Sequence, residues 1–152
     1  MEGIKWPEGL GTENCRILSH NQIWTPLSPQ ILWDKLVRAP LWPGWYPNSR
    51  EVKIQDGSSE LKMGSEFTWK TFGLKVRSKV LIYEPFENLG WDAQEIFGWR
   101  GFHGWRFIPK DSGTLVITQE VQKGVGDFLL APLVKKTLEK GHQVWLEQLV
   151  KE

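Results

Sequence analysis

His103 is the side chain in this sequence best suited to acid–base chemistry. It lies in the segment Trp99–Phe107, whose residues alternate between apolar and polar. Side chains of a strand point alternately to opposite faces, so Trp99 and Trp105 share the face of His103. A neutral imidazole can take a proton from an acidic C–H or hydroxyl group and return it elsewhere, and its ordinary pKa of about 6.5 suits that work. We therefore predict that His103 contacts a ligand, with catalysis as a hypothesis. The alternative is a core histidine that hydrogen-bonds within the sheet.

A second titratable group, Glu120, lies in the alternating segment 114–122. Its carboxylate could orient His103, or it could act as an acid if burial raises its pKa. The alternative is a solvent-facing strand glutamate that pairs with Arg106 or Lys79. His103 and Glu120 are the catalytic candidates of this chain.

Tryptophan is unusually frequent, with 10 among 152 residues. Aromatic rings bury large apolar areas, stack on planar molecules and attract cations to their faces. We therefore predict an internal site for a small hydrophobic or aromatic molecule. Its expected wall consists of Trp45, Trp69, Val80, Trp91, Trp99, His103, Trp105, Phe107, Leu138 and Trp145. The alternative is that the tryptophans fill a solid core and leave little space.

The spacing of the histidines does not indicate a metal site. His20, His103 and His142 lie far apart in the sequence and match no metal-ligand pattern. The chain also lacks the G-x-S-x-G pattern of a serine nucleophile and a phosphate-binding loop. We expect no metal and no other cofactor. His142 is predicted to be a partly exposed residue of a helix face, and His20 could face either the site or solvent.

The charge balance argues against nucleic acid as a partner. With 19 basic and 18 acidic residues, the net charge is +1, which builds no strong positive field. The single cysteine, Cys15, cannot form an internal disulfide and gives no sign of an oxidising compartment. Residues 1–13 contain no signal peptide pattern, and the uncharged stretch around Phe128–Val134 is too short to span a bilayer. We expect a cytoplasmic monomer or homodimer without integral membrane association.

The length suits one domain that is stable without a disulfide or metal. Residues 1–13 are polar and glycine-rich and are expected to form a flexible arm, which leaves 14–152 as the domain. A first strand is predicted at 16–24. Ser28 and Pro29 then favour the start of a helix that ends near Arg38. Prolines in 39–45 allow at most a short second helical turn.

From about residue 50 the apolar pattern has a period of two, which is typical of antiparallel sheet. The alternating sets are Val52 and Ile54; Phe67, Trp69 and Thr71; Val76, Ser78, Val80 and Ile82; Leu89, Trp91 and Ala93; and then segments 99–107 and 114–122. A long amphipathic C-terminal helix follows, predicted from apolar residues at helical spacing: Leu130, Val134, Leu138, Trp145 and Leu149.

Seven antiparallel strands must cover the apolar face of their sheet. One long helix is too narrow to do so without leaving space beneath it. The expected fold is therefore α+β. A seven-stranded curved antiparallel sheet wraps around the C-terminal helix, with two short helices after the first strand and an internal cavity.

Several fragments, in this order and spacing, are similar to a known family. They include Ile23–Pro26, Leu32–Leu36, Trp42–Asn48, Gly64–Phe67, Gly101–Phe107 and Gly113–Val116. Together they resemble the START-like superfamily, also called SRPBCC, which includes polyketide cyclase/dehydrase-like and lipid-transport domains. The resemblance covers residues 16 to 150 and implies the helix-grip fold. It does not imply one function, because this fold hosts carriers, receptors, cyclases and co-chaperones.

The resemblance also bears on two segments. The pattern of 114–122 leaves its facing ambiguous, whereas family analogy implies that Val116, Thr118 and Glu120 face the pocket. In such folds the segment with Trp42, Trp45 and Tyr46 borders the pocket mouth. These three side chains could form a lid, or they could pack beneath the sheet as hydrophobic anchors.

Three functions remain open from the sequence. The first is binding of a small hydrophobic molecule of aromatic, polyketide-like or lipid-like character in the cavity. The second is a cyclase, dehydratase or isomerase that uses His103 with Glu120. The third is a protein-interaction module of the co-chaperone type, with a packed interior.

Overall fold

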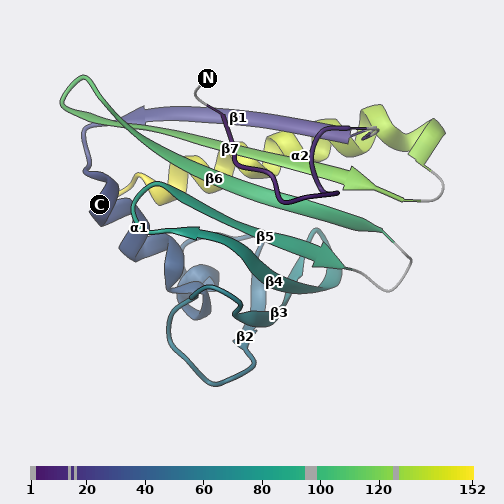
Figure 1. Cartoon of the computed structure of the whole chain (residues 1–152), viewed down its shortest axis with the longest axis horizontal. Helices are drawn as coiled ribbons and strands as arrows, with labels where there is room; N and C mark the ends of the chain where they lie inside the picture. Colours follow the sequence, from purple (N-terminus) through teal and green to yellow (C-terminus); the bar gives the residue numbers. More distant parts are fainter. Residues whose placement is uncertain (1–2, 14, 16, 95–98, 125–126) are drawn as a thin grey trace.

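The computed structural model describes residues 3–13, 15, 17–94, 99–124 and 127–152 (Figure 1). Along the chain it contains β1 (Ile17–Thr25), α1 (Pro29–Val37), the 3-10 helix η1 (Ala39–Gly44), β2 (Arg50–Ile54), β3 (Glu66–Thr71), β4 (Leu74–Glu84), β5 (Asn88–Gln94), β6 (Arg100–Lys110), β7 (Gly113–Lys123) and α2 (Asp127–Leu149). Position 16, where the first strand was expected to begin, lies outside the described residues, as does the side chain of Leu130.

One antiparallel sheet contains the seven strands, in the order β1-β7-β6-β5-β4-β3-β2. The sheet curves, and α2 crosses one of its faces (Figure 1). This confirms the predicted seven-stranded helix-grip architecture with two short helices after β1. Within the described residues, no helix is both long and apolar enough to cross a membrane.

The two short helices begin and end where local chemistry requires. The Ile31 N–H donates to Ser28 Oγ at 3.4 Å, and Pro29 occupies the first helical position, where no backbone donor is needed. Pro43 lies inside the next helical segment, which forms as the tighter 3-10 helix η1. The indole N–H of Trp42 donates to the Leu36 carbonyl at 2.8 Å and ties η1 to the end of α1.

The concave face of the sheet carries the larger hydrophobic core. Trp145 of α2 lies at its centre and stacks on Tyr46, with ring centroids 4.3 Å apart and planes 10° from parallel. Trp42 packs edge-on against Trp145 at 5.1 Å. Both Trp42 and Tyr46 are fully buried, so they are hydrophobic anchors beneath the sheet and not a lid over the pocket.

The convex face carries a smaller core that includes the N-terminal segment. Ile4 and Leu10 are buried there against Phe102 of β6. Gly104 makes this possible, because a Cβ at that position would lie 2.3 Å from Ile4 Cγ2. The segment expected to be a flexible arm is therefore packed on the sheet. Its two buried apolar side chains, Ile4 and Leu10, are too widely spaced to form a recognisable strand or helix pattern.

Strand β4 departs from its predicted alternation at one point. The register with β5 shifts between Val80 and Ile82, as a β-bulge produces. Val80 stays in the concave core, whereas Ile82 packs with the convex core and Tyr83 returns to the concave side. A bulge places two successive residues opposite one partner, so the period of two cannot continue through it.

The facing of β7 agrees with the family analogy. Val116 lies in the concave core and Ile117 in the convex one. Thr118 and Glu120 follow Val116 on the same face, and Glu120 is the partner of His103 in the β6–β7 register. This pairing brings the two catalytic candidates together.

Candidate functional site

A cavity of about 320 Å³ lies between the sheet and α2. Its wall comes from β3 to β7, from the turn between β3 and β4, and from α2. Its wall includes two exposed apolar side chains, Leu74 (44% exposed) and Leu133 (62% exposed), which we take to mark its mouth. The other end contains buried polar side chains, among them His103 and Glu120.

Six of the ten predicted wall residues line this cavity: Trp69, Trp91, Trp99, His103, Leu138 and Trp145. The catalytic candidate Glu120 lines it as well. Apart from Trp99, which directly precedes β6, these residues come from β3, from β5 to β7 and from α2. Strand alternation and helix periodicity therefore place side chains from separate elements around one cavity.

The other four predicted residues, Trp45, Val80, Trp105 and Phe107, do not line the cavity. Phe107 packs edge-on against Trp33 of α1 at 6.1 Å, and Trp105 packs against Trp145 at 5.0 Å. Val80 is buried in the same core, and Trp45 lies nearer the surface, with Lys35 Nζ 4.9 Å from its ring centroid. Alternation places a side chain on a face, but helices α1 and η1 decide which part of that face is filled.

Residues missed by the sequence reading form much of the mouth and the polar end. They are Thr71, Phe72, Leu74, Val76, Ala93, Arg100, Gly101, Gln122, Leu133, Val134, Thr137 and His142. Thr71, Val76 and Ala93 were placed in alternating strand sets and Val134 on the helix stripe, so the signal was present without a reason to select them. No local pattern indicates Phe72 or His142.

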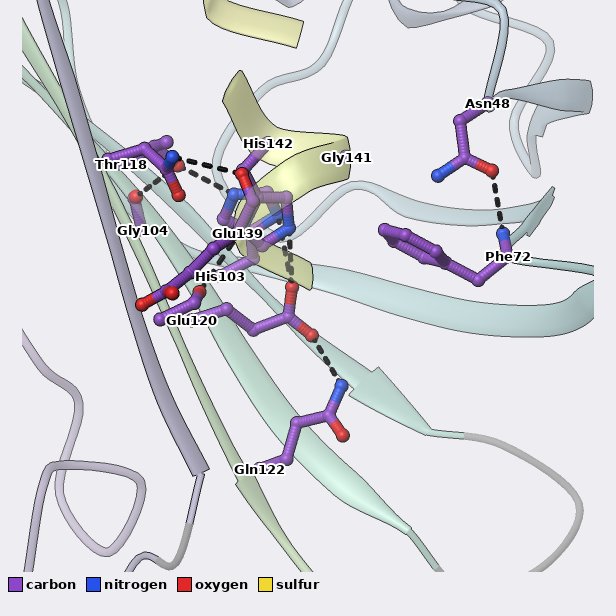
Figure 2. Close-up of polar contacts among 12 residues, drawn as sticks. Asn48, Phe72, His103, Gly104, Thr118, Glu120, Gln122, Glu139, Gly141 and His142 are labelled. Atoms are coloured by element: carbon purple, nitrogen blue, oxygen red, sulfur yellow. Dashed lines mark hydrogen bonds and ion pairs between the residues drawn. The ribbon is translucent and has the colours of Figure 1, made fainter. Parts of the chain in front are cut away.

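Phe72 lies at the mouth because of an unusual turn. Its φ is 50° and that of Gly73 is 75°, which gives the tight connection that a two-residue hairpin needs. The Phe72 N–H donates to Asn48 Oδ1 at 2.9 Å (Figure 2). Gly141 of α2 leaves room for the ring, since a Cβ there would lie 2.6 Å from Phe72 Cζ. The ring therefore packs against α2 beside His142, with centroids 6.3 Å apart.

Three buried titratable side chains from three elements meet at the polar end (Figure 2): His103 of β6, Glu120 of β7 and His142 of α2. His142 Nε2 lies 3.0 Å from Glu120 Oε2, and His103 Nδ1 lies 3.7 Å from the same oxygen. The two imidazole centroids are 4.4 Å apart. We call this group the His–Glu–His cluster.

The contacts of Thr118 with His103 and Gly104 favour one tautomer of His103. Thr118 Oγ1 donates to the Gly104 carbonyl at 3.2 Å, because a carbonyl can only accept. The hydroxyl therefore accepts from His103 Nε2–H at 2.7 Å. Burial, followed by the charge of His142, lowers the pKa of His103 to about 3 against an opposing effect of Glu120. His103 is neutral at ordinary pH, and the lone pair of Nδ1 points toward Glu120.

Glu120 is a buried carboxylate that stays ionised. Burial by itself raises its pKa, but the hydrogen bond from His142, the charges of His142 and His103, and the hydrogen bond from Gln122 bring it down to about 2. Gln122 Nε2 donates to Oε1 at 2.9 Å. The carboxyl group therefore holds no proton to donate near neutral pH, which disfavours the general-acid role considered for it. Arg106 donates to Asn88 instead of pairing with Glu120.

His142 is only 1% exposed, so the prediction of a partly exposed helix-face residue is wrong. Its Nδ1 lies 3.2 Å from Ser19 Oγ of β1. Side chains of β1, β7 and the β3–β4 turn contact His142, which the spacing within the helix cannot indicate. The third histidine, His20, is exposed on β1 and contacts Gln22 and Gln119.

The cluster has the donor atoms of a metal site. His103, Glu120 and His142 each offer one ligand atom, and these atoms lie within 4.8 Å of one another. Spacing along the sequence could not reveal this group, because each of its members comes from a different element.

A family model described as "Polyketide cyclase / dehydrase and lipid transport" matches residues 20–152. The chain belongs to this family. The match spans every strand and helix described above except the start of β1, and it includes the whole His–Glu–His cluster. Membership in the polyketide cyclase/dehydrase and lipid transport family agrees with the resemblance seen in the sequence. No curated protein matches the chain.

Solved structures support the same fold. A hypothetical protein, jhp0584, from Helicobacter pylori is 26% identical; the match covers 99% of this chain and 95% of that one, with a TM-score of 0.90. TTHA0849 from Thermus thermophilus is 16% identical over 88% of this chain and 94% of its own, with a TM-score of 0.71. The ZhuI aromatase/cyclase from Streptomyces sp. R1128 is 14% identical over 88% and 90%, with a TM-score of 0.70.

Proposed function

We propose that this protein binds one small hydrophobic molecule of aromatic, polyketide-like or lipid-like character in the cavity beneath α2. The observation that carries the proposal is the cavity itself, about 320 Å³ with indole rings in its wall. This volume lies at the lower end of the roughly 300–1,000 Å³ typical of small-molecule sites. An interior of this kind does not favour a protein-interaction module, which needs no internal space.

The two ends of the cavity suit different parts of such a ligand. The exposed side chains of Leu74 and Leu133 give the cavity an apolar entrance. Covering them with an apolar part of a ligand removes apolar surface from water, which is favourable. At the buried end, Gln122 and the His–Glu–His cluster offer polar contacts. A ligand with one or more oxygen atoms would therefore be favoured over a pure hydrocarbon.

Titration with N-phenylnaphthylamine, a neutral aromatic probe, tests this proposal. We expect saturable quenching of tryptophan fluorescence by one equivalent of probe. Val134→Trp and Ala93→Phe add bulk at half-buried positions of the wall and should weaken binding at least about tenfold, or ~1.4 kcal/mol.

Met63→Trp is the matched control, because Met63 is 61% exposed and is not one of the residues that line the cavity. It should bind the probe as the wild type does. A wild-type protein that shows no saturable quenching would refute the proposal. So would filled variants with unchanged affinity.

A cyclase or dehydratase is the second candidate function. The observation that favours it is the lone pair of His103 Nδ1 at the buried end of the cavity, beside the ionised Glu120. It ranks second because a pKa of about 3 makes His103 a weak base. Incubation with a linear poly-β-ketone, followed by mass spectrometry, would reveal a cyclised or dehydrated product. His103→Gln should then abolish turnover while probe binding persists.

A further inference from the structure

We propose that His103, Glu120 and His142 bind one divalent transition-metal ion, with coordination positions left open toward the cavity. The ion would have two imidazole nitrogens and one carboxylate oxygen as protein ligands. This inference goes beyond the proposed binding of a hydrophobic molecule and does not depend on it.

The distances in the His–Glu–His cluster are those of a nearly formed metal site. Zinc binds imidazole nitrogen and carboxylate oxygen at roughly 2.0–2.2 Å, so neighbouring ligand atoms lie about 3.0–3.6 Å apart. The separation of 3.0 Å between His142 Nε2 and Glu120 Oε2 lies within this range, and the 3.7 Å between His103 Nδ1 and the same oxygen is slightly longer. All three ligand atoms lie within 4.8 Å of one another, so small side-chain adjustments would bring them around one ion.

A positive ion between His103 and Glu120 would complement the lone pairs that face each other there. The Nδ1 lone pair of His103 faces an ionised carboxylate oxygen, so two electron-rich atoms lie opposite each other without a hydrogen between them. Within the part of the chain that the structure describes, no lysine or arginine forms an ion pair with Glu120. The described contacts of the Glu120 carboxylate are with His142, His103 and Gln122, and a metal ion would accept both lone pairs and add positive charge beside the carboxylate.

Each histidine is oriented by a hydroxyl group on the ring nitrogen that does not face Glu120. His103 Nε2 contacts Thr118 Oγ1 at 2.7 Å, and His142 Nδ1 contacts Ser19 Oγ at 3.2 Å. Metal-bound histidines almost always use their second nitrogen in this way, which fixes the ring and the tautomer. Ser19 is itself buried and can accept the Nδ1–H that a metal-bound His142 requires.

The turn of α2 that carries His142 is held in place. Asn21 of β1 donates to the Glu139 carbonyl at 3.0 Å and to Gln143 Oε1 at 3.1 Å. Tyr46 Oη donates to the Gly141 carbonyl at 3.4 Å. A site whose ligands are held before the metal arrives loses less conformational entropy on binding.

The donor set points to Zn²⁺, Fe²⁺ or Co²⁺ and not to Mg²⁺ or Ca²⁺, which take oxygen ligands. Three protein ligands leave at least one position open, as in catalytic zinc sites and in non-haem iron sites with two histidines and one carboxylate. All three residues line the cavity, so the open positions can accept an oxygen or nitrogen atom of a molecule within it.

Titration of the metal-stripped chain with Co²⁺ tests the proposal, using protein that carries no polyhistidine tag. We expect one equivalent to bind, with visible absorption bands of nitrogen and oxygen ligands, and Zn²⁺ should displace it. Glu120→Gln and His142→Gln each remove one ligand and should weaken binding by more than about 100-fold. Thr118→Val keeps all three ligands and should weaken binding by roughly 10–100-fold.

His20→Gln is the matched control, since this histidine is exposed on β1 and outside the cluster. It should bind Co²⁺ as the wild type does, and near-UV circular dichroism should show that each variant retains its packed tryptophan core. A folded wild type that binds no Co²⁺ or Zn²⁺ at a 1:1 ratio would overturn the proposal. Equal affinity of wild type and Glu120→Gln would do so too. Neither result bears on binding of N-phenylnaphthylamine, so the two proposals fail separately.

Discussion

At the scale of single residues, His103 shows that a strand pattern predicts which face a side chain occupies but not its protonation state. Alternation places its side chain on the apolar face with Trp105, and the structure agrees. Its chemical character, however, comes from Thr118 and His142, which belong to other elements. Burial among these groups changes an imidazole that would titrate near neutrality into a neutral one. Any role of His103 must therefore use its lone pair.

Thr118→Val tests whether this network is a structural unit in the metal-free protein. The substitution keeps the shape of the side chain but leaves His103 Nε2–H and the Gly104 carbonyl without their partner. Unsatisfied buried polar groups cost about 1–3 kcal/mol, and we expect a loss of that size in the free energy of unfolding by urea. Thr68→Val on the half-buried face of β3 is the control and should change it by less than ~0.5 kcal/mol. Equal losses would contradict the assignment.

At the scale of elements, the convex core shows what a composition-based reading misses. The N-terminal segment is polar and rich in glycine, yet two of its side chains are buried. Gly90 and Gly104 lie opposite each other in β5 and β6, and together they leave room for Phe102 and Ile4. The absence of a Cβ at Gly90 and Gly104 lets another side chain pack closely against the strand. This role of the two glycines can be recognised only once the neighbouring side chain is known.

A double-mutant cycle between Ile4 and Gly104 measures this contact. Ile4→Ala removes three buried carbons and should lower the free energy of unfolding by about 2 kcal/mol. Gly104→Ala should also destabilise, because its new Cβ would displace the segment around Ile4. In the Ile4→Ala background it should cost at least ~0.5 kcal/mol less than in the wild type.

Gly44→Ala is the control, since a Cβ at Gly44 meets no atom within 4 Å. Additive effects of the Ile4 and Gly104 substitutions in urea unfolding would mean that the N-terminal segment does not pack on β6 in solution.

At the scale of the whole molecule, Trp145 connects helix α2 to η1 and to the sheet. Its ring stacks on Tyr46 and packs edge-on against Trp42, Trp105 and His103, so α2, η1 and β6 meet at one side chain. The same ring forms part of the cavity wall. Fold stability and the shape of the site therefore depend on one residue.

Trp145→Ala should destabilise the protein by about 3–5 kcal/mol, the usual cost of removing a large buried aromatic ring. Trp24→Ala is the matched control. Trp24 is 47% exposed, and its indole makes one hydrogen bond, to the Lys110 carbonyl, so we expect a loss of only about 1 kcal/mol. Urea unfolding followed by far-UV circular dichroism measures both. Similar losses for the two variants would show that Trp145 does not join α2 to the sheet.

The sequence by itself determined the fold, because strand alternation, the Ser28–Pro29 helix start and the C-terminal helix are local signals. Six of the ten residues that it predicts for a ligand site, His103 among them, line the cavity that the structure describes. The sequence could not anticipate the bulge after Val80, since an inserted residue leaves the composition of a strand unchanged. It could not separate cavity positions from filled ones either, because α1 and η1 decide which part of the sheet is covered.

Only the tertiary structure brought His142 to His103 and Glu120. Two of these residues meet through a strand register that family analogy implied. The third, His142, lies on helix α2, which packs against the curved sheet. The sequence around His142 does not indicate that its side chain lies close to His103 and Glu120. A side chain's partners across space set its protonation and its capacity to bind a metal. The chemistry of this site was therefore decided by packing.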